Sequence, residues 1–84
     1  MATDRQERRK RAHDLDVTVW VGKGGIAAVT DELRDQLHER ELVKVKFLRA
    51  ARGGTSTEDL AAELAETVEA TLVETRGNTA VYAR

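Results

Sequence analysis

The sequence contains no cysteine, which excludes disulfides, thiolate metal sites and a cysteine nucleophile. Histidine is also scarce, because His13 and His38 are the only imidazoles and lie far apart in the sequence. No apolar run approaches the length of a membrane span. The basic N-terminus is not followed by the apolar run of a secretory signal. We therefore expect a soluble cytoplasmic protein that holds no metal and no cofactor.

The chain has 84 residues, enough for one domain with one hydrophobic core but not for two. Apolar residues make up only 40% of it and charged residues 35%, so the core must be thin and the polar surface large. Such a domain has little room to enclose a small substrate. We expect a single domain over residues 1–84 that is not an enzyme.

The formal net charge of −1 does not point to a polyanionic partner, but the basic residues are unevenly distributed. They collect at the N-terminus, at Lys23 and along residues 44–52. Most acidic residues fall in two segments with a helical pattern. A neutral chain with one basic face can still attract a polyanion, because the local field steers it.

Hydrophobic periodicity predicts seven elements in the order αβαβαββ. Helices are expected over residues 4–13 and 26–39 and after an N-cap at Ser56; strands are expected over 17–21, 42–47, 71–75 and 79–82. The helical core positions are expected to be Ile26, Val29, Leu33, Leu37, Leu60, Leu64 and Val68. Gly77-Asn78 is typical of a hairpin turn between the last two strands. Strand–helix–strand units with short links favour a two-layer α/β domain.

The segment Gly22-Lys23-Gly24-Gly25 is the first candidate site, because it lies between a strand and an amphipathic helix. A helix N-terminus presents unpaired N–H groups and partial positive charge. Glycines let a phosphate approach those groups, and Lys23 adds a full charge. The G-x-x-G spacing is similar to the loop with which KH modules clamp nucleotides. The alternative is a tight turn whose glycines only satisfy backbone geometry. The longer motifs of P-loops and dinucleotide sites are missing.

Two further groups of cations are candidates for phosphate contacts. The N-terminal group is Arg8, Arg9, Lys10 and Arg11, and the strand group is Lys44, Lys46 and Arg49. The alternatives are a solvated helix face for the first group, favoured when the run is taken alone, and an ordinary exposed sheet face for the second.

Aromatic side chains could also contact bases. Trp20 lies two residues before the glycine loop and could stack a base. A lone aromatic residue on a strand more often belongs to the core, so we expect Trp20 to be buried, and Tyr82 likewise.

Four ordered segments carry a resemblance to a known family. They are Ala12-His13-Asp14-Leu15, Val21-Gly22-Lys23-Gly24-Gly25, Glu41-Leu42-Val43-Lys44-Val45-Lys46 and Gly77-Asn78-Thr79-Ala80-Val81. In this set the chain resembles the CRM domain (chloroplast RNA splicing and ribosome maturation) in its stand-alone prokaryotic YhbY-like form. The resemblance spans nearly the whole chain.

The resemblance implies a fold similar to the C-terminal domain of translation initiation factor three. It implies RNA binding centred on the loop from Gly22 to Gly25. Stand-alone prokaryotic members are associated with precursors of the large ribosomal subunit, so the implied partner is ribosomal RNA. We expect a monomer that uses the glycine loop and the two groups of cations.

Rival functions come from other classes. A DNA-coating, chromatin-like protein could have a similar shape and charge. A protein-interaction module could dock its basic segment on acidic partners. A small phosphotransfer enzyme is a more distant alternative.

Overall fold

The computed structural model describes residue 12 and residues 14–84, so the helix predicted over residues 4–13 lies almost entirely outside the described residues. A four-stranded mixed sheet forms one layer, in the order β1-β2-β4-β3. Its strands are β1 (Val17–Val21), β2 (Leu42–Phe47), β3 (Thr71–Arg76) and β4 (Thr79–Ala83). β1 is parallel to β2, whereas β4 is antiparallel to both β2 and β3. The predicted strands are all present, with bounds that differ by at most one residue.

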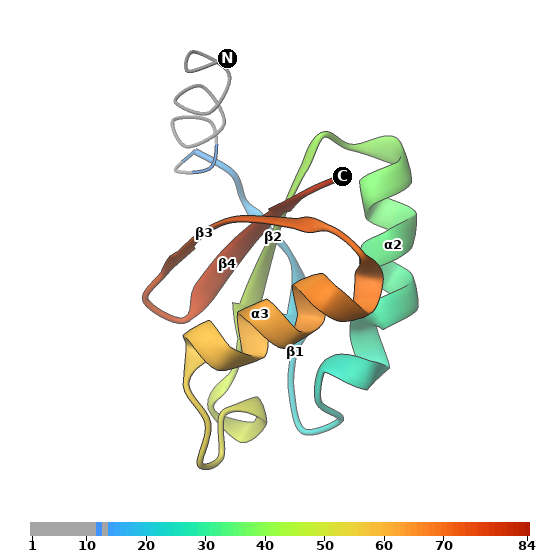
Figure 1. The fold of residues 1–84 in the computed structure, drawn as a ribbon. Helices are drawn as coiled ribbons and strands as arrows, with labels where there is room; N and C mark the ends of the chain where they lie inside the picture. Colours follow the sequence, from blue (N-terminus) through green and yellow to red (C-terminus); the bar gives the residue numbers. More distant parts are fainter. Residues whose placement is uncertain (1–11, 13) are drawn as a thin grey trace.

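Two helices form the second layer on one face of the sheet (Figure 1). They are α2 (Thr30–Glu39) and α3 (Thr57–Val68), and two short 3-10 turns accompany them, η1 (Ile26–Val29) and η2 (Arg49–Ala51). The two-layer α/β architecture predicted from the sequence is therefore confirmed.

The core lies between the sheet and the helices, because alternate strand residues and one stripe of each helix are apolar. Six of the seven predicted helical core residues are buried, and Ile26 packs against them half-buried. Tyr82 is also buried, as expected, and its hydroxyl donates to the Ala61 carbonyl oxygen at 2.9 Å. Burial raises the pKa of the Tyr82 phenol, so the side chain stays neutral at physiological pH.

Neither of the two helices described lies on the opposite face of the sheet, and the chain covers one end of that face with its own residues. Ala12 is fully buried there in a small cluster with Leu42, Val81 and Ala83, against which Leu15 packs. Lys44 and Lys46 lie on this open face, because Val43, Val45 and Phe47 alternate with them and point into the core. The prediction of a two-faced second strand is confirmed.

The two ends of α3 are fixed in different ways. Ser56 caps the first turn as predicted, its Oγ accepting the Asp59 N–H at 3.1 Å. At the other end Glu69 adopts a left-handed conformation with φ 56° and ψ 44°. Glycine usually occupies such a position, because an L-residue is strained there by contact between its Cβ and the backbone.

We expect Glu69→Gly to stabilise the protein. Relief of the left-handed strain, about 1–2 kcal/mol, exceeds the extra chain entropy of glycine, about 0.5–1 kcal/mol. Glu69→Ala is the matched control, since it also removes the carboxylate but keeps Cβ. In thermal unfolding followed by circular dichroism, Glu69→Gly should melt above Glu69→Ala by roughly 2–8 °C. Equal melting temperatures would show that relief of the left-handed strain does not exceed the entropic cost of glycine.

Candidate nucleic-acid interface

Three connections meet at one end of the sheet. The parallel strands β1 and β2 end there, and β4 begins there after its hairpin with β3. Hydrogen bonds join the connections directly. Leu48 N–H donates to the Val21 carbonyl at 2.8 Å, and Phe47 N–H donates to the Asn78 carbonyl at 2.8 Å. The glycine loop, the segment after β2 and the 77–78 turn are therefore neighbours.

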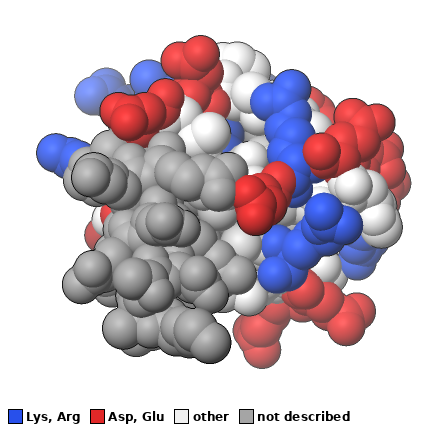
Figure 2. Space-filling model, turned by 90° about the horizontal axis from the view of Figure 1, so that it is seen from above, with Lys and Arg blue, Asp and Glu red and all other residues white. Residues whose placement is uncertain are grey.

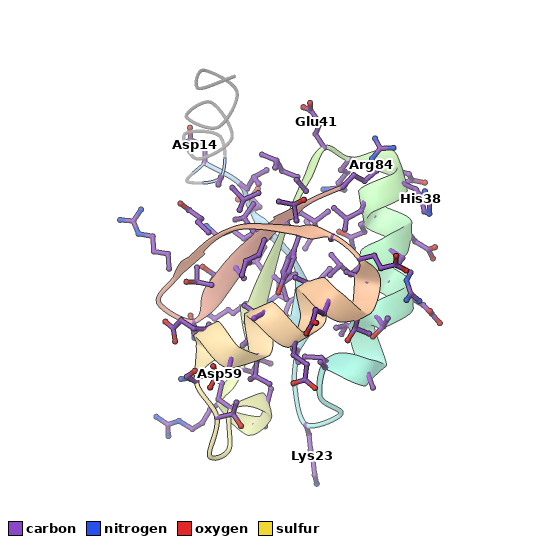
Figure 3. The ribbon with its side chains drawn as sticks, viewed as in Figure 1. Asp14, Lys23, His38, Glu41, Asp59 and Arg84 are labelled. Carbon is purple, nitrogen blue, oxygen red and sulfur yellow. The ribbon has the colours of Figure 1, made fainter. Side chains whose placement is uncertain are left out.

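The glycine loop is a closed turn with its lysine at the tip. Gly25 N–H donates to the Gly22 carbonyl at 2.9 Å, and Gly25 has φ 74° and ψ −175°, a conformation essentially restricted to glycine. A Cβ on Gly24 would lie 3.0 Å from the Ala28 Cβ. The backbone conformation at Gly25 and the closeness of Ala28 to Gly24 thus explain why glycine occupies both positions. Lys23 is exposed and points away from the body of the protein (Figure 3).

The helix after this loop differs from the prediction in its first turn. The segment is helical over the expected range, but residues Ile26–Val29 form a 3-10 turn, and α2 begins only at Thr30. The Thr30 hydroxyl donates to the Ile26 carbonyl at 3.0 Å, a side-chain bond that competes with regular helix geometry. The N-terminus of α2, with Asp31 and Glu32 in its first turn, is therefore one turn away from the loop. The helical segment that follows the glycines thus begins as a 3-10 turn with Gly25 as its N-cap, not as an α-helix, and Lys23 supplies the full positive charge there.

Trp20 is exposed, so its predicted burial is wrong. Its exposed fraction is 53%, and it lies on the open face because Val19 and Val21 on either side point into the core. An irregularity between Val17 and Val19 turns Thr18 to the helix face, where its hydroxyl donates to Gln36 Oε1 at 2.6 Å. The orientation of Trp20 thus follows from the alternation of side chains over Val19–Val21. Its aromatic character does not decide which face it occupies.

Strand register puts Trp20 in a row with two cations. Trp20 pairs with Lys46 of β2, Lys46 with Thr79 of β4, and Thr79 with Arg76 of β3. The row therefore crosses the whole open face at the end near the glycine loop. Arg76 was not a candidate from the sequence, because only the pairing of distant strands brings it level with Lys46.

The segment after β2 adds charge beside this row. Arg49 is exposed in η2, and Arg52 Nε donates to the Phe47 carbonyl at 3.1 Å, which holds the segment against the end of β2. Leu48 is 38% exposed. Lys44 lies two residues before Lys46 on β2, further from the glycine loop, and pairs with Val17 and Val81.

We use the name loop-end surface for six residues, which are Trp20, Lys23, Lys46, Leu48, Arg49 and Arg76. Four of them are cations, and the acidic Glu58 and Asp59 follow in the first turn of α3, on the helix side (Figure 3). The end of the molecule that carries Glu41 and Arg84 looks different. Described acidic and basic side chains alternate across it (Figure 2).

The structure thus brings together most of the predicted site residues. Gly22 to Gly25, Lys46 and Arg49 lie at one end of the sheet, and Lys44 lies further along the open face. The N-terminal group Arg8, Arg9, Lys10 and Arg11 lies outside the described residues.

Other kinds of site are less evident. Among the described residues, no three His, Asp or Glu side chains gather closely enough to hold a metal ion. No helix in the described part of the chain is long and apolar enough to cross a membrane. A shallow pocket of about 220 Å³ lies at the opposite end, between the end of α2 and the turn after α3. Arg34 beside it donates to the Thr67 carbonyl at 2.8 Å, which links α2 to α3.

The fold and the site thus define a class of protein: a small α/β domain in which a glycine loop and several cations lie at one end of the sheet. The family model of the CRS1/YhbY (CRM) domain matches residues 2–84. The chain therefore belongs to the CRM domain family.

Two similar proteins extend this comparison. One is a protein of Methanocaldococcus jannaschii named as a probable RNA-binding protein, 40% identical over 70 residues, which are 83% of this chain. The chain spans about half the length of that relative, 52%. The other is a hypothetical protein of Staphylococcus aureus, described as a candidate RNA-binding protein. Its solution structure matches all of this chain and 86% of its own with a TM-score of 0.78 and 30% identity.

Proposed function

We propose that this chain binds RNA through the loop-end surface. The observation that carries the proposal is the meeting of the glycine loop with Lys46, Arg49 and Arg76 at one end of the sheet. Cations from four separate segments lie at this end, and several cations spread over a surface suit a phosphate backbone better than one small anion. Membership of the CRM family and the RNA-binding descriptions of both relatives support the same function.

Each residue has a distinct proposed role. Lys23 contacts a phosphate from the tip of the loop, where Gly22, Gly24 and Gly25 keep side chains out of the way. Lys46 and Arg49 follow the backbone across the end of β2, and Lys44 extends the track along the open face. Arg8, Arg9, Lys10 and Arg11 add electrostatic attraction. No chemical step is required of any of them, so we propose a binding protein and not an enzyme.

We further propose that the RNA is ribosomal and that the chain assists assembly of the large ribosomal subunit as a monomer in the cytoplasm. This follows from the resemblance to stand-alone prokaryotic CRM proteins. Sequencing of RNA crosslinked to the protein in cells tests it. Enrichment of precursor large-subunit RNA is the expected result, and enrichment of messenger RNA alone would contradict the ribosomal assignment.

Binding should be electrostatic and selective for RNA. If three to five phosphates are contacted, log K should fall with log salt with a slope of about −2 to −4.5, at roughly 0.7–0.9 per contact. Fluorescence anisotropy with a labelled RNA hairpin, duplex DNA and heparin at several salt concentrations measures this. We expect the hairpin to bind most tightly. Equal affinity for all three would indicate general charge attraction, tighter DNA binding would favour the chromatin-like alternative, and an affinity independent of salt would point to apolar protein contacts.

A further inference from the structure

The open face presents an exposed indole next to cations. Trp20 is the only tryptophan of the chain and is 53% exposed. Lys46 pairs with it on the neighbouring strand, so the two backbones are about 4.8 Å apart. Arg76 ends the same row on the far edge strand, roughly 14 Å from β1.

Folding alone does not account for this exposure. Val19 and Val21 supply the contribution of β1 to the core, and neither needs an aromatic neighbour on the other face. The other end of the open face is covered by the chain itself, through Ala12 and Leu15. Among the residues that the structure describes, the end of this face with Trp20 and Lys46 presents both an exposed indole and a cation.

This combination fits a nucleotide. An aromatic ring stacks on the π-face of any base, and cations beside it neutralise the phosphates that flank the base. A basic or purely apolar protein surface would offer no complementary charge to Lys46. The surface is continuous with the glycine loop, because Trp20 is two residues before Gly22.

We propose that Trp20 stacks an unpaired base of the bound RNA, with Lys46 on the neighbouring strand holding an adjacent phosphate. Bases inside a duplex already stack on one another, so an aromatic side chain on a strand reaches only bases that are unpaired or splayed out. The RNA on the sheet is therefore single-stranded. The preferred ligand is an RNA that offers unpaired nucleotides next to the segment held by Lys23. This inference depends on the proposed RNA binding and specifies its ligand.

The single tryptophan gives a direct test. The probes are a single-stranded RNA of about 12 nucleotides, its duplex, and the same strand with abasic ribose at every position. Titrations follow Trp20 fluorescence and, separately, anisotropy of a label on the RNA. The single strand should quench Trp20 at the concentrations at which anisotropy rises. The abasic strand should bind at least about fivefold more weakly than the intact strand.

Two substitutions at the same position separate stacking from apolar contact. Trp20→Leu keeps an apolar side chain but lacks a π-face, and Trp20→Phe keeps one. Both should fold, because the side chain is exposed, and circular dichroism checks this. Trp20→Leu should lose at least about fivefold in affinity for the single strand, whereas Trp20→Phe should lose less. Duplex affinity should be equal in the two variants.

The outcomes separate the two proposals. Unchanged affinity of Trp20→Leu for the single strand, with a loss in Lys23→Glu, would overturn base stacking and leave RNA binding intact. Equal losses of Trp20→Leu for single strand and duplex would also overturn it. Self-association that Trp20→Leu abolishes would identify a protein contact instead. Failure of the unmodified protein to bind any of the probes at low salt would overturn RNA binding itself.

Discussion

Replacing Lys23 with glutamate is expected to weaken binding to an RNA hairpin about 10- to 100-fold, because hydrogen bonds to charged groups contribute about 1.5–3 kcal/mol and the new carboxylate repels the phosphate. Lys23 is exposed at the tip of a loop, so the free energy of unfolding should change by no more than about 0.5 kcal/mol. Anisotropy gives the affinity and thermal unfolding gives the stability.

The matched control is Arg40→Glu. It makes the same change in formal charge at an exposed residue, the C-cap that follows α2, at the opposite end of the sheet. Arg34 on α2 is less suitable, because its side chain donates to the Thr67 carbonyl and its Nη1 lies 3.6 Å from the Asp31 carboxylate. If Lys23→Glu and Arg40→Glu lost equal affinity with unchanged melting temperatures, total charge and not the loop would hold the RNA.

Local features of the fold could be predicted from the sequence. Alternation in residues 42–47 fixed the faces of β2, Ser56 marked the start of α3, and Gly77-Asn78 marked the hairpin. Each of these depends on residues close in the sequence, where periodicity and capping act directly.

Features that depend on distant residues or on backbone detail could not be predicted. The insertion of β4 between β2 and β3 sets Arg76 level with Lys46, and no local pattern contains that pairing. The 3-10 turn before α2 and the left-handed Glu69 are backbone conformations that their side chains do not signal.

Trp20 is a different case, because the information was present. The sequence Val17–Val21 alternates apolar with other residues, and over Val19–Val21 that alternation places Trp20 on the face opposite to Val19 and Val21. Residue type outweighed periodicity in the expectation of a buried indole. A large aromatic residue out of phase with the apolar positions of its strand is better treated as a candidate contact residue.

The site was predictable in part for the same reasons. Lys23 and its glycines form a contiguous motif, so they could be identified without the fold. Lys46 could be identified from the alternation of β2, and Arg49 from its position two residues after that strand. Trp20 and Arg76 needed the register of the sheet, which joins them to Lys46 in one row.

The glycines of the loop should differ sharply in their tolerance of alanine. Gly25→Ala is expected to lower the free energy of unfolding by about 1–3 kcal/mol, because φ 74° with ψ −175° is essentially inaccessible to a residue with a Cβ. The melting temperature should fall by roughly 4–24 °C. Gly24→Ala should cost less, since its Cβ would meet only the Ala28 Cβ at 3.0 Å and its φ is not in the left-handed region.

Gly53→Ala is the control for this series. No heavy atom lies within 4 Å of the Cβ it would carry, and its φ is also outside the left-handed region. The substitution should be neutral or stabilise the protein by about 0.4–1 kcal/mol, because alanine lowers the entropy of the unfolded chain. Thermal unfolding should therefore rank the variants Gly53→Ala, Gly24→Ala and Gly25→Ala in falling order of stability. A Gly25→Ala variant as stable as Gly53→Ala would mean that the loop can relax out of its turn. The tip that presents Lys23 would then not be preorganised, and the fixed geometry on which the proposed phosphate contact depends would have to be abandoned.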